Sequence, residues 1–577
     1  MDKQFRFDGK TFRFSFSQPT EIDFQPLEPR NGVRYYRINF SWSATVHPEK
    51  ITLEWETPAV NAYYTWDPLE KVRSLPFFNR ATQSRVAYGM PIKALVSKTS
   101  RNACTIALSD PETPLTLNMR CDCTSGCIHY GAEFFTMQTG PFDEYQTVLR
   151  IDERDLPFDE AIPDAAEWIR EQKSGSVPSA AIAPMYSTWY SYMQNVTAEK
   201  VIEECRKAAE FGMKTVILDD GWQIEHSDGA YSFCGDWTPS KSKFPDMKAF
   251  TSAVHALGMK VMLWFAVPFI GKNAAVYPEF QGKYLCDLPD LGCSVLDPRF
   301  PSVRKFLTDT YVNAVKNYNL DGLKLDFIDR FKTNGTVPVG TDYRSVEQAV
   351  TALLEETYSA LEKIKPGIML EFRQPYFGTV VSAFGNMIRV WDCPLDSNTN
   401  MTQTINLRLI SRNCAVHSDM IYWHENDSLE NVACSLWGTV FAVPQISARL
   451  NSITPEQSRV LKRFSDYRTQ NAALLTFGKI RTRLCENGYD ATEVLDNNLR
   501  ICLLSASPVI TLDRHARTDA VNLTNERQII VRNAENEPLD IAVYDCFGNL
   551  TLSENSAAAL LSLPVPFAGM ISVNKNN

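Results

Sequence analysis

The sequence predicts three parts: an N-terminal β-sandwich, a central (β/α)8 barrel and a C-terminal antiparallel β domain. Two changes in hydrophobic period along the chain carry this prediction. Apolar and polar side chains alternate with a period of two over residues 1–176, strand-like runs alternate with amphipathic helices over 177–478, and a period of two returns over 479–577. A chain of 577 residues is also too long for one hydrophobic core.

The first part has the alternation of half-buried strands. Phe12, Phe14 and Phe16 are separated by polar residues, and the same spacing recurs twice before residue 56. Aromatic and β-branched residues at this spacing are typical of a sandwich. A short connecting helix is expected over residues 159–172, followed by a Lys-Ser-Gly-Ser linker at 173–176.

In the central part, buried strand-like runs end in polar residues and alternate with helices. The helix expected over residues 197–211 has Thr197 as its N-cap and Gly212 as its stop, and Thr454 begins another helix with a capping-box Gln457. Repeated β–α alternation of this length indicates a parallel sheet closed into a barrel. An open doubly wound sheet is the alternative, but the glycine-rich turn that normally follows its first strand is missing at residues 189–193.

Composition and charge exclude several classes of function. The net charge of -10 argues against a nucleic-acid-binding protein, because phosphate binding needs a surplus of Lys and Arg. No apolar run of membrane-spanning length occurs, and the first residues lack a signal-peptide pattern. We therefore expect a cytoplasmic protein that binds neither nucleic acid nor membrane.

No metal or cofactor is predicted. Three cysteines and a histidine cluster at residues 121–129, but their spacing is not that of a zinc finger, and the alternation predicts a hairpin. Metal-dependent hydrolases with this fold usually carry a His-x-His pair on the first strand, which is absent here. His417 and Asp419 are expected to shape the rim of the site.

In a (β/α)8 barrel the active site forms at the C-terminal ends of the strands. The residues predicted there are rich in carboxylates and tryptophan, a combination typical of carbohydrate sites, because aromatic faces pack on sugar rings and carboxylates bind hydroxyls. They are Trp189, Asp219, Asp220, Trp222, Trp264, Lys324, Asp326, Arg373, Arg389 and Asp392.

Asp326 is the predicted nucleophile of a glycosidase. Two carboxylates about 5–5.5 Å apart hydrolyse a glycoside with retention. Asp326 lies in an otherwise apolar strand, where a charge is costly without a partner, and Lys324 faces the same side. A structural ion pair is the alternative interpretation. Arg373 is expected to line the same pocket and to pair with Glu371.

Five motifs occur in order in the central part, at residues 186–190 (YSTWY), 218–223 (LDDGWQ), 235–245 (GDW and KFP), 257–264 (LGMKVMLW) and 323–326 (LKLD). Together they resemble the barrel of glycoside hydrolase family 36, the α-galactosidases and their raffinose-synthase relatives. The resemblance implies that Asp326 attacks the anomeric carbon. It also implies a galactose pocket, with hydroxyls bound by acids and lysine and walls of tryptophan, formed by Asp219, Asp220, Lys324, Trp222 and Trp264.

Of the two neighbouring acids, Asp220 is slightly preferred as the hydroxyl ligand, since Asp219 could instead cap the following turn. The general acid/base is predicted to be Asp392, with Asp396 as the alternative. Many family members have a Ser-Asp-x-Thr-Asp run near the sixth strand, whereas this chain has an Arg-x-x-Asp segment, starting at Arg389, that is similar to raffinose synthases. The strand-end position favours Asp392. Its apolar neighbours are expected to raise its pKa, which a general acid needs.

The resulting hypothesis is retaining hydrolysis of terminal α-galactosides in oligosaccharides or glycoconjugates. Transfer of the galactosyl group to a sugar acceptor, or hydrolysis of an α-N-acetylgalactosaminide, would use the same two aspartates. A non-catalytic carbohydrate-binding protein is a further alternative, disfavoured because both candidate aspartates are retained. The resemblance also implies a possible homo-oligomer.

Overall fold

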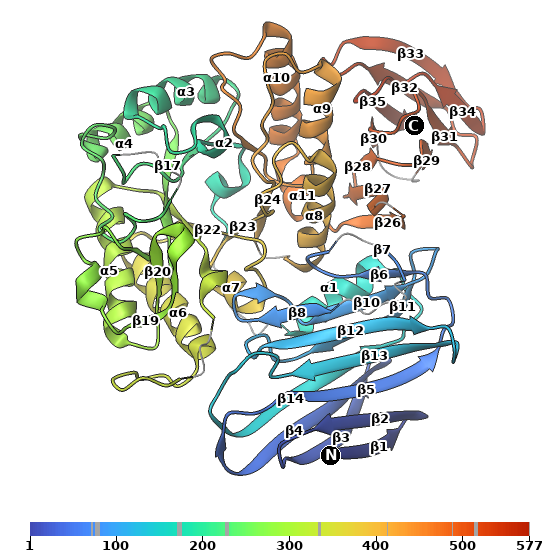
Figure 1. Cartoon of the computed structure of the whole chain (residues 1–577). Coiled ribbons are helices and arrows are strands. Elements are labelled where there is room, and N and C mark those ends of the chain that lie inside the picture. The colour runs from blue at the N-terminus through green and yellow to red at the C-terminus, as the bar shows by residue number, and fades with distance from the viewer. Residues whose placement is uncertain are drawn as a thin grey trace.

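The computed structural model describes residues 1–70, 73–75, 81–169, 176–225, 230–332, 336–411, 414–486, 488–512 and 517–575. Figure 1 shows an N-terminal pair of sheets, a central barrel and a C-terminal group of sheets. This order of fold classes confirms the prediction. Among the described residues, no helix combines the length and apolarity needed to span a bilayer.

We propose domain boundaries after residues 176 and 478. Helix α11 (Ala472–Phe477) ends and strand β26 (Arg481–Cys485) begins on either side of the second boundary. At the first boundary the expected helix is α1 (Phe158–Ile169). Most of the expected linker falls in residues 170–175, outside the described residues.

The N-terminal domain is a sandwich of two seven-stranded antiparallel sheets. The first has the order β1 (Asp2–Phe7), β2 (Lys10–Phe16), β5 (Ile51–Pro58), β13 (Cys127–Phe134), β12 (Leu115–Asp122), β8 (Thr82–Arg85), β9 (Tyr88–Gly89). The second has the order β3 (Glu21–Arg30), β4 (Val33–Val46), β14 (Phe142–Asp152), β11 (Asn102–Leu108), β10 (Ile92–Val96), β6 (Tyr64–Trp66), β7 (Arg73–Ser74). The inward-facing aromatic residues of both sheets form one core, which includes Phe12 and Phe14.

The cysteine cluster of this domain is a hairpin, as the alternation predicts. Strands β12 and β13 pair from Leu115 with Phe134 to Asp122 with Cys127. His129 lies beside two carboxylates, 3.3 Å from Asp122 and 3.5 Å from Glu56.

Eight parallel strands form the barrel. Their order is β15 (Met185–Ser187), β16 (Thr215–Leu218), β17 (Lys260–Ala266), β21 (Gly322–Asp326), β22 (Met369–Arg373), β23 (Met387–Arg389), β24 (Ala415–His417), β25 (Gln445–Ile446). The ring closes because β25 pairs with β15, and bridges join His417 to Val443 and Ile421 to Ile446. Asp326 therefore ends the fourth barrel strand, and Asp392 follows the sixth.

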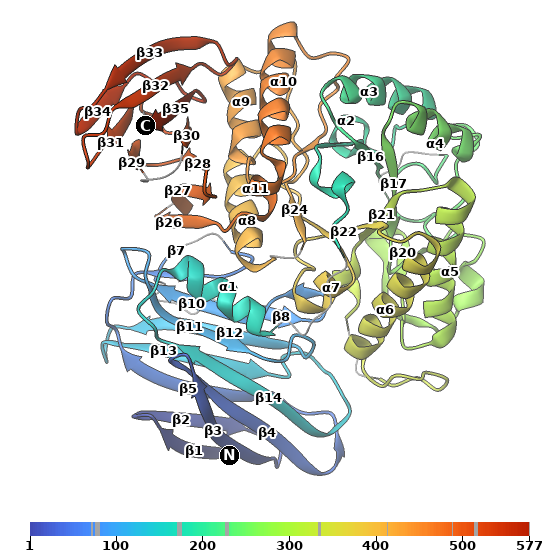
Figure 2. The same ribbon diagram turned by 180° about the vertical axis from the view of Figure 1, so that it is seen from behind.

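Helices follow the barrel strands and cover the outside of the ring (Figure 2). They are α2 (Trp189–Tyr192), α3 (Ala198–Glu210), α4 (Met247–Ala256), α5 (Pro301–Tyr318), α6 (Val346–Ile364), α7 (Thr379–Ala383), α8 (Ser397–Ile410), α9 (Leu429–Gly438), α10 (Pro455–Gln470). The Thr197 side chain caps α3, and Thr454 and Gln457 form the capping box of α10, as predicted. After the third strand the chain inserts a small sheet that the sequence did not reveal, β18 (Phe269–Gly271), β20 (Cys293–Leu296), β19 (Tyr284–Leu288).

Inward-facing side chains fill the barrel in layers, because they alternate along each strand. Along the third, fourth and fifth strands, two successive layers are in register: first Met262, Gly322 and Met369, then Trp264, Lys324 and Glu371. A Cβ on Gly322 would lie 2.5 Å from the Met369 carbonyl oxygen, so only glycine fits at position 322 of the lower layer. The floor of the barrel is therefore apolar and closely packed, and charged groups begin one layer above it.

The C-terminal domain has two sheets. The larger has the order β26, β27 (Gly488–Leu495), β28 (Leu499–Leu504), β30 (Arg517–Asn522), β35 (Met570–Lys575), β32 (Leu539–Tyr544), β33 (Leu550–Ser556). The smaller contains β29 (Val509–Thr511), β31 (Ile529–Arg532), β34 (Leu560–Leu563). Most neighbours are antiparallel, as predicted, but β28 pairs with β30, and β29 with β31, in parallel.

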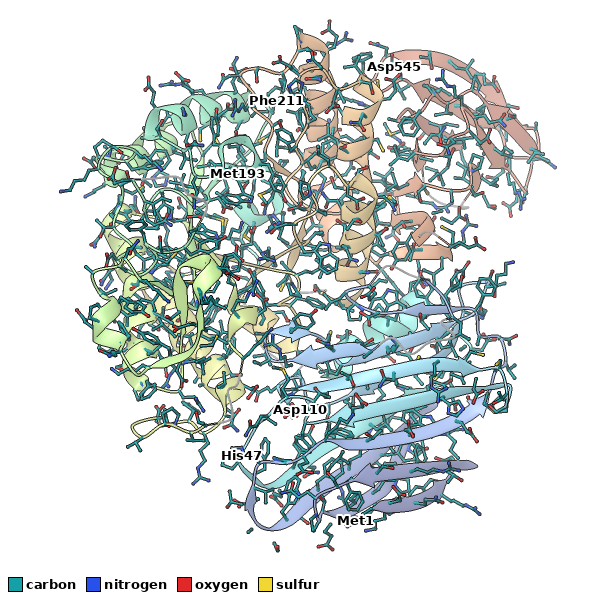
Figure 3. The ribbon with its side chains drawn as sticks, viewed as in Figure 1. Met1, His47, Asp110, Met193, Phe211 and Asp545 are labelled. Carbon is teal, nitrogen blue, oxygen red and sulfur yellow. The ribbon has the colours of Figure 1, made fainter. Side chains whose placement is uncertain are left out.

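The sandwich contacts the barrel at several points. The guanidinium of Arg85, after β8, donates hydrogen bonds to the carbonyl oxygens of Asp329 and Phe331, just beyond the fourth barrel strand. At the sandwich edge marked by Asp110 in Figure 3, the next turn presents Glu112, which accepts a hydrogen bond from Thr351 of α6. The N-terminal domain thus supports a loop that leaves the candidate nucleophile strand.

All three domains meet at one buried hydrogen-bonded cluster. The indole N–H of Trp66, in the sandwich, lies 3.2 Å from Asn406 Oδ1 in α8 and 3.1 Å from the Tyr489 hydroxyl in the C-terminal domain. The Tyr489 hydroxyl donates to the same oxygen of Asn406. These groups are shielded from water, so the polar atoms depend on one another for partners.

We expect Trp66→Phe to lower the midpoint of thermal unfolding clearly, because a buried acceptor loses a donor, at a cost of about 1–3 kcal/mol. Trp42→Phe is the matched control, since its indole N–H binds Thr20 within the sandwich alone and is only partly buried. Differential scanning calorimetry would compare the two variants. An equal or smaller shift for Trp66→Phe would contradict this role of the junction.

Candidate functional site

The ends of the second and fourth strands bring two predicted sugar ligands together. Lys324 Nζ lies 2.6 Å from Asp219 Oδ2, and both side chains are buried. Asp220 turns elsewhere: its oxygens accept hydrogen bonds from Gln194 and Gln223, each at 2.7 Å. These contacts place Asp219, rather than the preferred Asp220, beside Lys324. Asp219 also accepts from the backbone N–H of Asp220, so the turn-capping alternative holds as well.

Asp326 is surrounded by donors. Trp264 Nε1 donates to Oδ2 at 3.0 Å, while Oδ1 accepts from Arg373 Nε at 3.0 Å and from the Tyr376 hydroxyl. The backbone N–H of Phe327 also donates to Oδ1, at 2.8 Å. Phe327 has a φ of 66°, which turns the chain sharply after the strand.

These partners determine the charge of Asp326. Burial alone would raise the pKa of its carboxyl, but the positive charges of Arg373 and Lys324 outweigh burial. With hydrogen bonds from Tyr376 and Trp264, they hold the pKa well below its ordinary value. Asp326 is therefore an ionised carboxylate at neutral pH. The expected pairing of Arg373 with Glu371 is wrong, because Arg373 reaches across to the neighbouring strand and binds Asp326.

A second buried guanidinium, that of Arg389, lies among three carboxylates. Nη2 is 2.9 Å from Asp392, Nη1 forms an ion pair with Asp419, and Nε is 3.7 Å from Glu371. Glu371 also accepts a hydrogen bond from Gln445, on the eighth strand. Asp419 is fully buried, so its expected position on the rim is wrong. His417 is equally buried, and burial lowers its pKa to about 3.

The acid/base candidates differ in their surroundings. Asp392 combines a bond to Arg389 with a side chain that is 46% exposed. Both oxygens of Asp396 bind Thr399, where Asp396 is the N-cap of α8. Asp396 therefore caps a helix.

The pKa of Asp392 is lowered, although its apolar sequence neighbours were expected to raise it. Burial favours its neutral form, but Arg389, then Arg373 and Lys324, hold the pKa below its ordinary value. The sequence neighbours of Asp392 suggested poor hydration. The guanidinium of Arg389, three residues earlier, instead determines the direction of the pKa shift, because it lies within hydrogen-bonding distance of Asp392.

The three tryptophans have different positions. Trp264 touches Asp326, as described. Trp222 has no exposed surface, and its indole N–H donates to the Trp264 carbonyl oxygen, so it packs behind Trp264 and does not wall the pocket as expected. Trp189 begins α2 after the first strand and keeps a partly exposed side chain.

Among the residues that bind site carboxylates, sequence reasoning missed Gln194 and Gln223 at Asp220, and also Tyr376 and Gln445. Tyr376 binds Asp326 from the loop after the fifth strand, and Gln445 binds Glu371 from the eighth strand. Tyr376 follows a strand end by three residues, a signal that could have been used. Gln445 had none, since its two-residue strand is too short for a recognisable period.

Comparison with known proteins gives a family for the barrel. Residues 178–371 match the family model described as Melibiase. The match runs from the first barrel strand into the fifth. The match to the melibiase domain includes the fourth strand with Lys324 and Asp326, and ends before Arg389 and Asp392.

Curated relatives match over short segments. Alpha-galactosidase 2 of Pediococcus pentosaceus is 31% identical over 157 residues, 26% of this chain and 22% of the relative. Alpha-galactosidase AgaA of Geobacillus stearothermophilus is 31% identical over 149 residues, 25% and 20% of the two chains. The chain is thus aligned with about a fifth of each relative's length.

Solved structures resemble nearly the whole chain. GH36 α-galactosidase AgaA of Geobacillus stearothermophilus, in a variant bound to raffinose, has a TM-score of 0.66 at 15% identity, covering 98% of this chain and 83% of that chain. The galactosidase domain of the α-galactosidase–sucrose kinase AgaSK also has a TM-score of 0.66, at 12% identity, covering 100% and 85%. At these identities the likeness shows a shared fold, in which the barrel lies between sheet domains.

We expect the stability of Asp220→Asn, relative to wild type, to rise with pH between about 4 and 6. Burial raises the pKa of Asp220 to about 6, so the folded wild type binds a proton that the unfolded chain, with a pKa near 4, has released. Wild-type stability therefore falls as pH rises through this window, and the asparagine variant lacks that loss. Thermal unfolding of both proteins in steps of pH would measure the difference in stability between them. A stability difference that stays constant across the window would contradict the raised pKa.

Proposed function

We propose that this protein hydrolyses terminal α-galactosides with retention, using Asp326 as nucleophile and Asp392 as general acid/base. One observation carries the proposal: Arg373 and Arg389 are register partners on neighbouring strands, and each binds one of the two aspartates. Neighbouring strands lie about 4.7–4.9 Å apart. That spacing supports a carboxyl separation near the roughly 5–5.5 Å of retaining enzymes.

The sugar side of the proposal rests on the groups beside Asp326. Asp219 and Lys324 offer an acceptor and a donor within 2.6 Å of each other, suited to a pair of ring hydroxyls. Asp220, Trp189 and Trp264 complete the proposed galactose pocket. The relatives named as α-galactosidases support galactose as the sugar.

In the first step, the Asp326 carboxylate attacks the anomeric carbon and forms an ester, while the glycosidic C–O bond breaks. Asp392 gives its proton to the departing oxygen. Tyr376, Trp264 and Arg373 bind the Asp326 oxygens and fix the direction of attack.

In the second step, Asp392, now ionised, takes a proton from water, and the water oxygen attacks the anomeric carbon. The ester bond breaks and Asp326 regains its charge. In the free site the charge of Asp326 partly opposes the arginines that lower the pKa of Asp392. Ester formation removes that charge, which favours the ionised form of Asp392 when it must act as a base.

We expect Asp326→Asn to lose at least about 10³-fold in kcat on an aryl α-galactoside, because the nucleophile is removed, while the sugar still binds. Isothermal titration with galactose would check binding. Asp321→Asn is the matched control: this buried aspartate precedes the same strand at the opposite end of the barrel and binds Lys365 and His255. Near wild-type activity in Asp326→Asn would refute the assignment.

We expect Asp392→Gly to be rescued at least partly by azide, and to lose less activity on substrates with good leaving groups, since these need no proton from the enzyme. Product analysis for α-galactosyl azide would check the rescue, because azide attacks the β-linked ester of Asp326 from the opposite face. Asp396→Gly should show neither effect, because both Asp396 oxygens bind Thr399 at the start of α8, a helix cap of about 1 kcal/mol. If Asp396→Gly alone were rescued, the acid/base would be Asp396.

A further inference from the structure

Asp419 and Asp392 share a single buried cation. Arg389 is 1% exposed and presents one N–H edge to each aspartate. Asp392 reaches solvent, whereas Asp419 is shielded completely and cannot touch a sugar. Asp419 can therefore act on the reaction only indirectly, and Arg389 is the charged group that joins it to Asp392.

Three segments hold Asp419 in place. The Tyr190 hydroxyl, on α2, and the Cys393 backbone N–H each donate to its Oδ2, at 3.1 and 2.7 Å. Asn400 of α8 accepts from the Asp419 backbone N–H and donates to its carbonyl oxygen. Asp419 is thus a fixed acceptor, and the direction of the Arg389 guanidinium follows from it.

The charged and titratable groups around this pair come from five elements. They are Lys324 and Asp326 of β21, Glu371 and Arg373 of β22, Cys393 after β23, His417 of β24 and Tyr190 of α2. Glu371 is the remaining acid beside Arg389, but 3.7 Å exceeds a hydrogen bond. Asp419 is therefore the stronger competitor of Asp392 for the guanidinium. Burial raises the pKa of Asp419 to about 6, so this competition is strongest above that pH.

We propose that Asp419 is a positioning residue that, by sharing Arg389 with Asp392, aims the Asp392 carboxyl and limits the pull of Arg389 on its ionised form. Without Asp419 the charge of Arg389 would act mainly on Asp392. The protonated form needed to expel a poor leaving group would then become rarer. This inference rests on the proposed function of Asp392.

The test is Asp419→Asn, compared on methyl α-galactoside, whose leaving group needs a proton, and on dinitrophenyl α-galactoside, whose leaving group does not. We expect kcat/KM for the methyl substrate to fall at least about tenfold, and its alkaline limb to move about one pH unit lower, with less than about a twofold change for the aryl substrate. Equal losses on both substrates, as a merely structural role would give, overturn the proposal. So does no change on either. Asp321→Asn, again the control, should affect both substrates alike.

Tyr190→Phe is a milder variant should Asp419→Asn fail to fold. It removes one donor to Asp419, which favours the neutral form of that acid, so the alkaline limb should move in the same direction by a smaller amount. An unchanged or opposite shift would count against the proposal.

A measurement without substrate separates this inference from the proposed function. The carboxyl ¹³C resonance of Asp392, assigned by its loss in Asp392→Asn, is titrated in wild type and in Asp419→Asn. A lower pKa of Asp392 in the variant supports the link through Arg389. If the wild type hydrolyses no galactoside but this shift is seen, only the proposed function fails. An unchanged pKa in an active enzyme sinks the inference alone.

Discussion

The register of two arginines on neighbouring strands is the constraint on which the site depends. Arg373 and Arg389 are both inside the barrel, where a cation is costly unless carboxylates surround it. Each arginine therefore holds an aspartate at the barrel mouth, and the strand spacing sets the two arginine backbones about 4.7–4.9 Å apart. Breaking a buried pair of this kind costs about 3–5 kcal/mol, so stability and chemistry depend on the same contacts.

The layers beneath the arginines explain why the charges gather at one end. Methionine side chains and Gly322 fill the lower barrel with closely packed apolar groups. Lys324 and Glu371 form the next layer, and the aspartates lie above them. The sandwich adds support from outside, since Arg85 binds the carbonyl oxygens of Asp329 and Phe331, which follow the strand of Asp326. The site is thus held both by the barrel and by a domain that contributes no reacting group.

The fold could be predicted from the sequence because its signals are local. Thr197 and Thr454 cap helices where expected, and the runs ending at Asp219 and Asp326 lead to the barrel mouth. The partners within the site were harder to predict. Glu371 and Arg373 lie two residues apart and face the same side of their strand, which suggested an ion pair between them. In the structure, Arg373 binds Asp326 of the strand on one side. Glu371 lies beside Arg389 of the strand on the other side. Such pairings depend on strand register, which no local pattern records.

The buried cluster of Trp66, Asn406 and Tyr489 has a consequence for engineering. Because each of the three side chains comes from a different domain, cutting away either sheet domain would strip a partner from α8 and open the helix that follows the acid/base loop to water. The barrel is therefore not a portable module. Transplanting its catalytic loops into another scaffold would require carrying the indole and phenol that shelter Asn406, or replacing all three with a well-packed apolar set.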